Sequence, residues 1–181
     1  MPLTVVDPKP ALLVVDLQNG IVGMGLPGTD DVVTRSAALA EAFREAGHPV
    51  VLVNVSHGVG GRSDRNPAGG VRVLDPAGLP VVPELGAADI AITKRSAGAF
   101  HATALEAELA ERGVTQVFIT GIATGTGVEA TGREAAARGL NVVTVVDAMI
   151  DMDPEVHEFC VHKVFGKWSQ TATTDEVLAA L

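Results

Sequence analysis

Residues 116–130 read QVFITGIATGTGVEA, and this stretch decides the fold class. Gln116–Thr120 is a short apolar run typical of a buried strand, and a turn with three glycines follows it. Thr126-Gly-Val-Glu129 has the spacing of a capping box, which predicts a helix that begins there and runs to Arg138. The stretch therefore predicts a strand, a tight turn and a helix, in the order of a β-α-β unit.

The same alternation extends outward over the whole chain. Further strands are expected at Ala11–Val15, Val50–Val55, Asp89–Thr93 and Asn141–Val146, with an edge strand near Gln170–Thr173. Further helices are expected at Asp31–Ala46, between Thr103 and Gly113, from Asp153-Pro154 and from Thr173. We predict one domain over residues 1–181, a three-layer α/β/α fold around a mostly parallel sheet of about six strands.

The composition excludes several classes of protein. A net charge of −9 over 181 residues argues against a nucleic-acid binder, which needs a basic surface. No apolar stretch approaches the roughly 18 residues of a membrane span, and no secretion signal stands at the N-terminus. The single cysteine, Cys160, allows no disulfide within the chain. We therefore expect a cytoplasmic protein with no nucleic-acid or membrane partner.

Polar residues follow several predicted strands, where ligands bind in open α/β sheets. Asp16 ends the first strand, Lys94 follows the third, and Asp147 ends the fifth. An Asp16–Lys94 pair could act as a general acid or base with an electrostatic partner. A carboxylate that only caps the next turn is an equally good interpretation of Asp16.

The glycine-rich turn offers a second kind of site. With Thr126 as N-cap, Gly127 is the first helical residue, and the backbone N–H groups there could bind an anion or a developing oxyanion. The alternative is that Gly121, Gly125 and Gly127 only make a tight connection between strand and helix.

Three stretches together resemble the isochorismatase-like, or cysteine hydrolase, superfamily. They are ALLVVDLQNG with Asp16 and Gln18, ITKRSAGAF with Lys94 and Phe100, and GIATGTGVEATGREA. The resemblance implies an α/β/α fold and an Asp–Lys–Cys triad that hydrolyses C–N bonds, with Asp16 and Lys94 in the first two positions. It also implies a cis peptide at Ile122–Ala123 and a substrate pocket lined or braced by Gln18, Phe100, Ala123 and Thr126. A turn hydrogen-bonder and a core aromatic are equally good interpretations of Gln18 and Phe100.

Gly127 occupies the third triad position, so no thioester can form there. Cys160 lies on the apolar stripe of a later helix, where a buried, inert thiol is expected instead. Some members of the resembled family carry glycine here, among them true isochorismatases, which use the aspartate as an acid on a vinyl ether. GVEATGR fits a group of small members of unknown activity.

The resemblance thus implies a hydrolase that acts on a small molecule without a cysteine nucleophile. The alternative is a catalytically silent homologue that binds a small molecule or serves as a scaffold. By the same resemblance we expect a homodimer or a larger homo-oligomer.

No metal or cofactor is expected. Some amidases of the resembled family bind zinc through Asp-x-His, but Asn54-Val-Ser-His57 lacks the aspartate and that spacing. Residues 56–88 show no sustained period and hold many glycines and prolines, which is typical of a lid, a partner contact or a linker. Within them, Arg62 and Arg65 could reach an anionic substrate, or lie in solvent or against a partner subunit.

Overall fold

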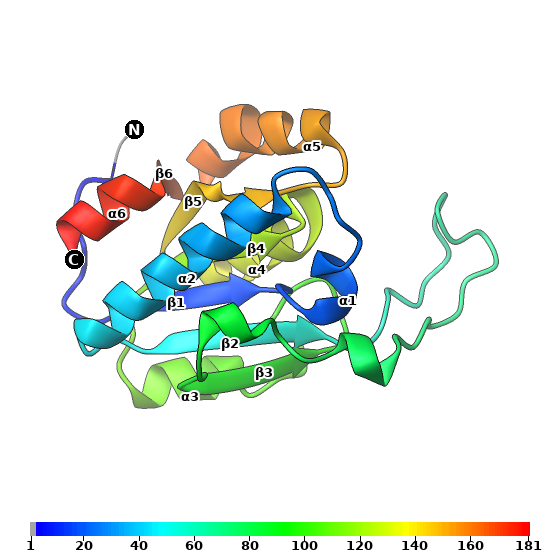
Figure 1. The fold of residues 1–181 in the computed structure, drawn as a ribbon, viewed down its shortest axis with the longest axis horizontal. Coiled ribbons are helices and arrows are strands. Elements are labelled where there is room, and N and C mark those ends of the chain that lie inside the picture. Colours follow the sequence, from blue (N-terminus) through cyan, green and yellow to red (C-terminus); the bar gives the residue numbers. More distant parts are fainter. Residues whose placement is uncertain (1–2) are drawn as a thin grey trace.

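The computed structural model describes residues 3–181, and a six-stranded sheet forms its centre (Figure 1). The strands are β1 (Pro10–Val15), β2 (Val50–Val55), β3 (Ile90–Lys94), β4 (Gln116–Ile122), β5 (Asn141–Ile150) and β6 (Gln170–Ala172). Their order across the sheet is β3-β2-β1-β4-β5-β6, and every pair is parallel. The predicted fold class is confirmed.

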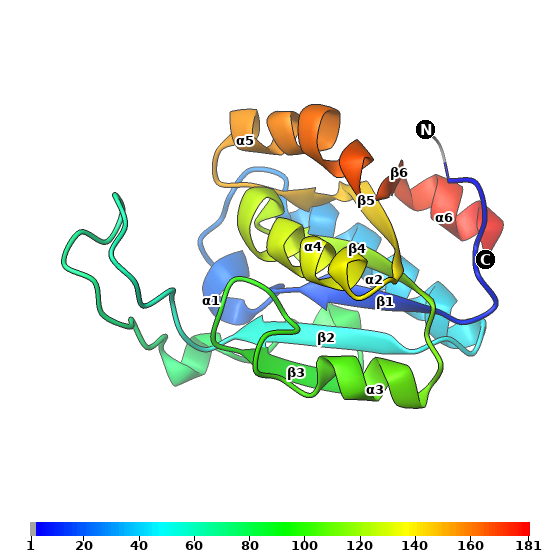
Figure 2. The ribbon, with the colours of Figure 1, turned by 180° about the vertical axis from the view of Figure 1, so that it is seen from behind.

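Helices cover both faces of the sheet, as Figures 1 and 2 show from opposite sides. One face carries α2 (Thr29–Glu45) and α6 (Thr174–Ala180), and the other carries α3 (Leu105–Glu111), α4 (Glu129–Ala137) and α5 (Pro154–Phe159) with the helical turns that follow it. A short helix, α1 (Asn19–Val22), lies after β1. No helix in residues 3–181 is both long and apolar enough to cross a bilayer.

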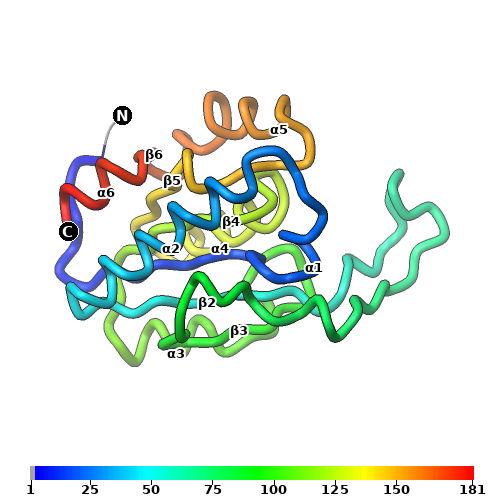
Figure 3. The backbone as a smooth tube through the Cα atoms, viewed as in Figure 1, coloured from blue at the N-terminus to red at the C-terminus, as the bar shows by residue number. Residues whose placement is uncertain are grey.

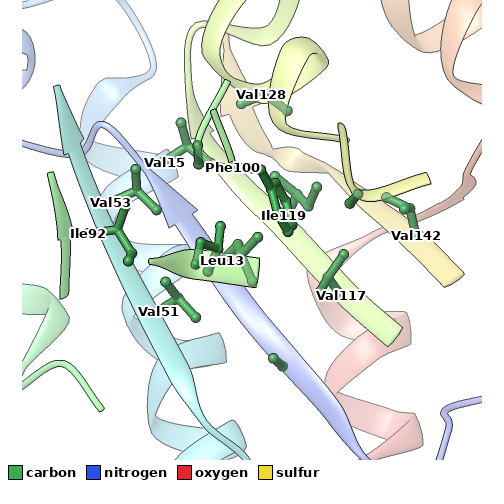
Figure 4. Packing of buried hydrophobic residues seen from close by; sticks show 14 of the residues in the cluster. Leu13, Val15, Val51, Val53, Ile92, Phe100, Val117, Ile119, Val128 and Val142 are labelled. Atoms are coloured by element: carbon green, nitrogen blue, oxygen red, sulfur yellow. The ribbon is translucent and has the colours of Figure 1, made fainter. Parts of the chain in front are cut away.

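Alternate residues of the central strand supply the two layers of the core. Leu13 and Val15 of β1 belong to the cluster that also holds Ile119 and Phe100 (Figure 4), whereas Leu12 and Val14 face α2 on the other side. Because all six residues of β1 are buried, the strand has to be apolar throughout. The chain leaves β1 in one direction towards β2 and returns to its other side as β4, so a topological switch point lies between β1 and β4.

Four of the five expected helices are found near their predicted positions. Asp153 caps α5 with Pro154 at the first helical position, and Thr173 forms the capping box of α6. The helix expected at Asp31–Ala46 is α2, and the helix expected between Thr103 and Gly113 is α3, which has no capping box because the Thr103 hydroxyl donates to the carbonyl of Ala99.

The helix expected to start at Thr126 instead follows a π-helical turn over Thr124–Val128. Here β4 continues to Ile122, and the carbonyl of Ala123 then accepts from the N–H of both Thr126 and Val128. Thr126 therefore lies inside a helical turn and cannot be an N-cap.

An extended arm, residues 58–75, projects away from the body (Figure 3). Its two sides are joined by a few backbone hydrogen bonds, such as those from Gly58 to Arg72 and from Gly70 to Gly60, and by the isolated bridges His57–Val73 and Ser63–Asn66. The irregular segment predicted for residues 56–88 is thus found, with two short 3₁₀ turns, Pro76–Gly78 and Pro83–Leu85, returning the chain to the body.

Candidate functional site

Asp16 turns the chain out of β1 at the switch point. Its φ of 57° places a non-glycine residue in the left-handed region, which aspartate tolerates better than most residues. Its backbone N–H donates to the carbonyl of Val53 at 2.8 Å, which holds the turn against β2. Only 4% of Asp16 is exposed, so its carboxylate lies inside the protein rather than at a solvated turn.

Lys94 reaches the same point from β3, two strands away. Its ammonium Nζ lies 2.8 Å from Asp16 Oδ2, and the side chains of both residues are buried. The ammonium also donates to the carbonyls of Ser96 at 3.2 Å and Ala97 at 2.8 Å. A lysine ammonium has three N–H groups, so these three acceptors account for all of them.

The segment that supplies these carbonyls is held by Glu134 of α4. Its Oε2 accepts from the backbone N–H of Phe100 at 2.8 Å. A side chain at Gly98 would collide with this carboxylate, which explains why that position has none. Glu134 thus fixes the loop that fixes Lys94.

The two oxygens of Asp16 have different surroundings. Oδ2 pairs with Lys94, whereas Oδ1 is buried and has no hydrogen-bond partner among the described residues. Burial raises the pKa of Asp16 to about 6, and the neighbouring ammonium of Lys94 limits that rise. A buried carboxylate oxygen without a partner disfavours the ionised form, in line with the raised pKa.

The turn after β4 forms the third side of the site. It starts with a cis peptide bond at Ile122–Ala123, as the resemblance implied. The N–H of Gly125 donates to Asp151 Oδ2 at 2.7 Å, and the N–H of Thr126 donates to the carbonyl of Ala123 at 3.1 Å. The expectation that the Thr126 amide could bind a substrate oxygen is therefore wrong, because the turn itself uses that donor.

Gly127 lies directly beside the ion pair. A Cβ built on it would stand 3.0 Å from Asp16 Oδ2 and 3.2 Å from a methyl group of Val15. A side chain at this position would thus press on the carboxylate. The glycine keeps side-chain atoms away from Asp16 at the position where the resembled family usually has a thiol.

A cavity of about 290 Å³ opens in front of these groups. It is lined by Asp16, Ile21, Val55, His57, Gly58, Val59, Leu74, Lys94, Ser96, Ala97, Ile122, Ala123, Thr126, Gly127 and Met152. Three strand ends, the turn after β4 and the base of the arm thus enclose one hollow. Asp16, Lys94, Ala123, Thr126 and Gly127, all expected at the site, lie together around it.

Gln18 does not line the cavity. Its side chain is buried and binds backbone only: its amide donates to the carbonyls of Val55 and Gly78, and it accepts from the N–H of Val55. It therefore braces the end of β2 against the chain that returns from the arm.

Phe100 lies in the core between sheet and helices, where the guanidinium of Arg138 stands 4.8 Å from its ring centre. It does not contact the cavity, because its ring points into the packed layer (Figure 4). Cys160 is likewise buried, and desolvation with the nearby carboxylates of Glu129 and Asp151 raises the pKa of its thiol. A raised pKa keeps a thiol protonated and unreactive.

Asp147 also lies outside the site. It is inside the longer β5, where its Oδ1 accepts from the N–H and hydroxyl of Thr174 and its Oδ2 faces Arg35. It joins α2 and α6 to the sheet.

Sequence reasoning missed His57 and Ser96 as lining residues. His57 follows the end of β2, so the rule that selected Asp16 and Lys94 could have selected it. Its Nδ1 lies 2.8 Å from the hydroxyl of Ser56. Within residues 3–181 no three His, Cys, Asp or Glu side chains lie close enough to hold a metal ion. The lack of a metal in the functional protein stays a prediction.

A doubly wound parallel sheet with a buried Asp–Lys pair at its switch point defines an α/β domain with an enzyme-like pocket. The sequence matches the Isochorismatase domain over residues 10–176. The chain belongs to the isochorismatase family of hydrolases.

Relatives cover almost the whole chain. An uncharacterized isochorismatase family protein, YecD of Escherichia coli O157:H7, is 38% identical over 94% of this chain and 95% of its own. The maleamate amidohydrolase of Pseudomonas putida is 27% identical over 96% and 87%. The structure of an isochorismatase family protein from Burkholderia thailandensis, 38% identical, superposes with a TM-score of 0.89 over 98% of this chain and 97% of that one.

Proposed function

We propose that this chain hydrolyses a small molecule without a covalent enzyme intermediate. Asp16 acts as the general acid or base, and Lys94 holds its charge state. Gly127 contributes only its backbone and the space beside Asp16. The name of one relative, the maleamate amidohydrolase of Pseudomonas putida, supports a carbonyl compound as substrate, and the family name supports an enol ether.

The Asp16 carboxyl at the wall of the cavity carries this proposal. Lys94 holds its Oδ2 at 2.8 Å, and Oδ2 is also the oxygen next to Gly127, so the carboxyl is fixed in place where a reactant would meet it. With a pKa of about 6, roughly a tenth of the Asp16 carboxyls are protonated at neutral pH. Either direction of proton transfer is therefore accessible near neutrality.

Direct attack by a water molecule in the cavity fits this arrangement. Asp16 would take one proton from the water as the water oxygen adds to a carbonyl carbon, and would return that proton to the leaving group as its bond to that carbon breaks. The N–H of Gly127 and the hydroxyl of Thr126 replace the Thr126 amide as the proposed donors to the substrate oxygen, and Ala123 forms the adjacent wall. For an enol ether, protonated Asp16 would instead deliver its proton to carbon.

One observation favours a second candidate function. The missing side chain at residue 127 removes the nucleophile that the resembled family usually has, while the pocket itself is complete. A silent small-molecule-binding or scaffolding homologue would show this combination. Assembly into a homo-oligomer and a cytoplasmic location stay predictions.

A panel of vinyl ethers, primary amides and N-carbamoyl compounds tests the proposal. The wild type should turn over at least one class, and Asp16→Asn should lower that turnover by about 10²–10⁴-fold through loss of proton transfer. Asp147→Asn is the matched control, because this second Asp is also partly buried but lies outside the cavity. It should retain turnover.

Three results separate the alternatives. Turnover in the wild type that Asp16→Asn abolishes supports the enzyme. Activity that appears only in Gly127→Cys supports the silent homologue. Equal background in all variants rejects Asp16 as the reacting group.

A further inference from the structure

The charges that line the cavity cancel. Asp16 and Lys94 are the only Asp, Glu, Lys or Arg among its lining residues, and they pair with each other at 2.8 Å. The remaining walls are largely aliphatic, with Ile21, Val55 and Ile122 prominent among them. A ligand in this cavity therefore meets no unpaired cation on the described chain.

Lys94 cannot take over the role of a carboxylate-binding residue. Its three N–H groups already point to Asp16 Oδ2 and to the carbonyls of Ser96 and Ala97. A ligand carboxylate would have to displace one of these acceptors inside a buried site. The residue is thus committed to holding Asp16 and its own loop.

An anionic ligand would also meet an unfavourable field. It would give up its hydration in a mostly aliphatic hollow and lie beside the carboxylate of Asp16. An ionised carboxylate accepts hydrogen bonds only, so Asp16 at the wall of the cavity favours a ligand N–H or O–H. The arginines of the arm, Arg62, Arg65 and Arg72, do not line the cavity.

The volume limits the size of the ligand. About 290 Å³ corresponds to roughly ten water molecules at ~30 Å³ each. It lies at the lower end of the range for small-molecule sites. A compound of about ten non-hydrogen atoms fills it.

We propose that the site takes an uncharged molecule of about ten non-hydrogen atoms that donates a hydrogen bond to the Asp16 carboxylate, and that it discriminates against carboxylates. This inference rests on the proposed function only in taking this cavity as the substrate site. It sets aside dicarboxylates such as isochorismate as the substrate class.

Benzamide and benzoate form a matched pair of probes, because they have the same size and shape and differ in charge. Isothermal titration calorimetry with the full chain at neutral pH should show benzamide binding at least about tenfold more tightly than benzoate. Asp16→Asn removes the negative charge but keeps the side-chain shape and leaves Lys94 positive. It should raise the affinity for benzoate at least tenfold relative to benzamide.

His57 provides the control for an alternative source of charge, since it also lines the cavity and contacts Ser56 through Nδ1. His57→Gln should leave the ratio of the two affinities within about threefold of the wild type. Should benzoate instead bind the wild type as tightly as benzamide, and lose that affinity in His57→Gln, the imidazole supplies the charge and the proposal fails.

The ratio of benzamide to benzoate affinity in the wild type tests the proposal even if Asp16→Asn does not fold. Binding of neither probe at millimolar concentration overturns the proposal as well, because the cavity then takes no ligand of this size. The titration reads affinity and not turnover. A chain that prefers benzamide but hydrolyses nothing would therefore refute the proposed function and leave this inference intact.

Discussion

The Thr-x-x-Glu segments at Thr126–Glu129 and Thr173–Glu176 share a capping pattern and fold differently. At Thr173–Glu176 the hydroxyl of Thr173 accepts from the N–H of Glu176, and Glu176 Oε2 accepts from the N–H of Thr173 at 2.8 Å. At Thr126–Glu129 no box forms: Thr126 lies inside a π-helical turn and Glu129 pairs with Arg133. The first segment follows its local pattern, and the second does not.

The difference lies in what surrounds each segment. Thr173 follows a three-residue strand at the edge of the sheet, away from the Asp16–Lys94 pair. The capping box can therefore form there without other tertiary constraints on the turn. Thr126 follows the strand that borders the switch point, and the turn must bring Gly127 against Asp16 while Ala123 binds two N–H groups. Tertiary placement thus overrides a local capping signal at the site.

The largest effect is expected for Gly121→Ala, which tests the close approach of β4 to β1. Gly121 lies in β4, just before the turn that carries Gly127. A Cβ at Gly121 would run into the carbonyl oxygen of Val15, and its φ of 122° disfavours any side chain. The clash sits between two backbones that cannot move apart within the sheet. We expect a loss of about 3 kcal/mol or more in the free energy of unfolding, measured by chemical denaturation.

Gly166→Ala is its matched control, because a Cβ there meets no atom within 4 Å. It should change the free energy of unfolding by no more than about 0.5 kcal/mol. Equal stability of the two variants would contradict the close approach of β4 to β1.

The second test compares the pH dependence of stability in the wild type and in Asp16→Asn. The folded protein raises the pKa of Asp16 from an ordinary 3.8 to about 6, so between these values the folded state binds more protons than the unfolded state. Stability therefore falls as pH rises through this window and levels off above about 6. The total change is at most ~3 kcal/mol.

Chemical denaturation of the wild type and of Asp16→Asn between about pH 4 and pH 7 gives the unfolding free energy of each protein as a function of pH. Asparagine tolerates the left-handed backbone of residue 16 and cannot titrate, so the variant should lack this part of the slope. A wild type that becomes more stable relative to the variant as pH rises would show that Lys94 outweighs burial.

The central strands β1, β2 and β4 could be predicted because each is a nearly continuous apolar run, whereas the polar β6 was predicted only as an edge strand. All six strands overlap their predicted ranges, although β5 continues past Val146 to Ile150. Its register against β4 shifts between Ile119 and Gly121, which lets Met149 pair with Gly121. Such a shift depends on two strands at once, so no pattern within either strand predicts it.

The site was predictable to the extent that strand ends determine it. Asp16, Lys94 and Gly127 could be named because the ends of parallel strands meet at one edge. The direction of a side chain could not be predicted in the same way. Gln18 points to backbone groups of β2 and of the chain that returns from the arm, and Phe100 points into the core, so both depend on residues far away in sequence. The bond from the Thr126 amide to Ala123 depends on the shape of the turn, which the capping pattern does not predict.

The smallest expected effect separates the two Thr-x-x-Glu segments themselves. Thr173→Ala removes a working cap and should lower the free energy of unfolding by about 1 kcal/mol without changing ligand binding. Thr126→Ala removes no cap and should change stability by less than about 0.5 kcal/mol, while it alters affinity or turnover because the residue lines the cavity. Chemical denaturation and ligand titration of both variants give the change in stability and the change in affinity for each. A stability loss in Thr126→Ala as large as that in Thr173→Ala would show that the Thr126 hydroxyl also stabilises its turn. The two threonines would then both be structural, although only Thr173 caps a helix.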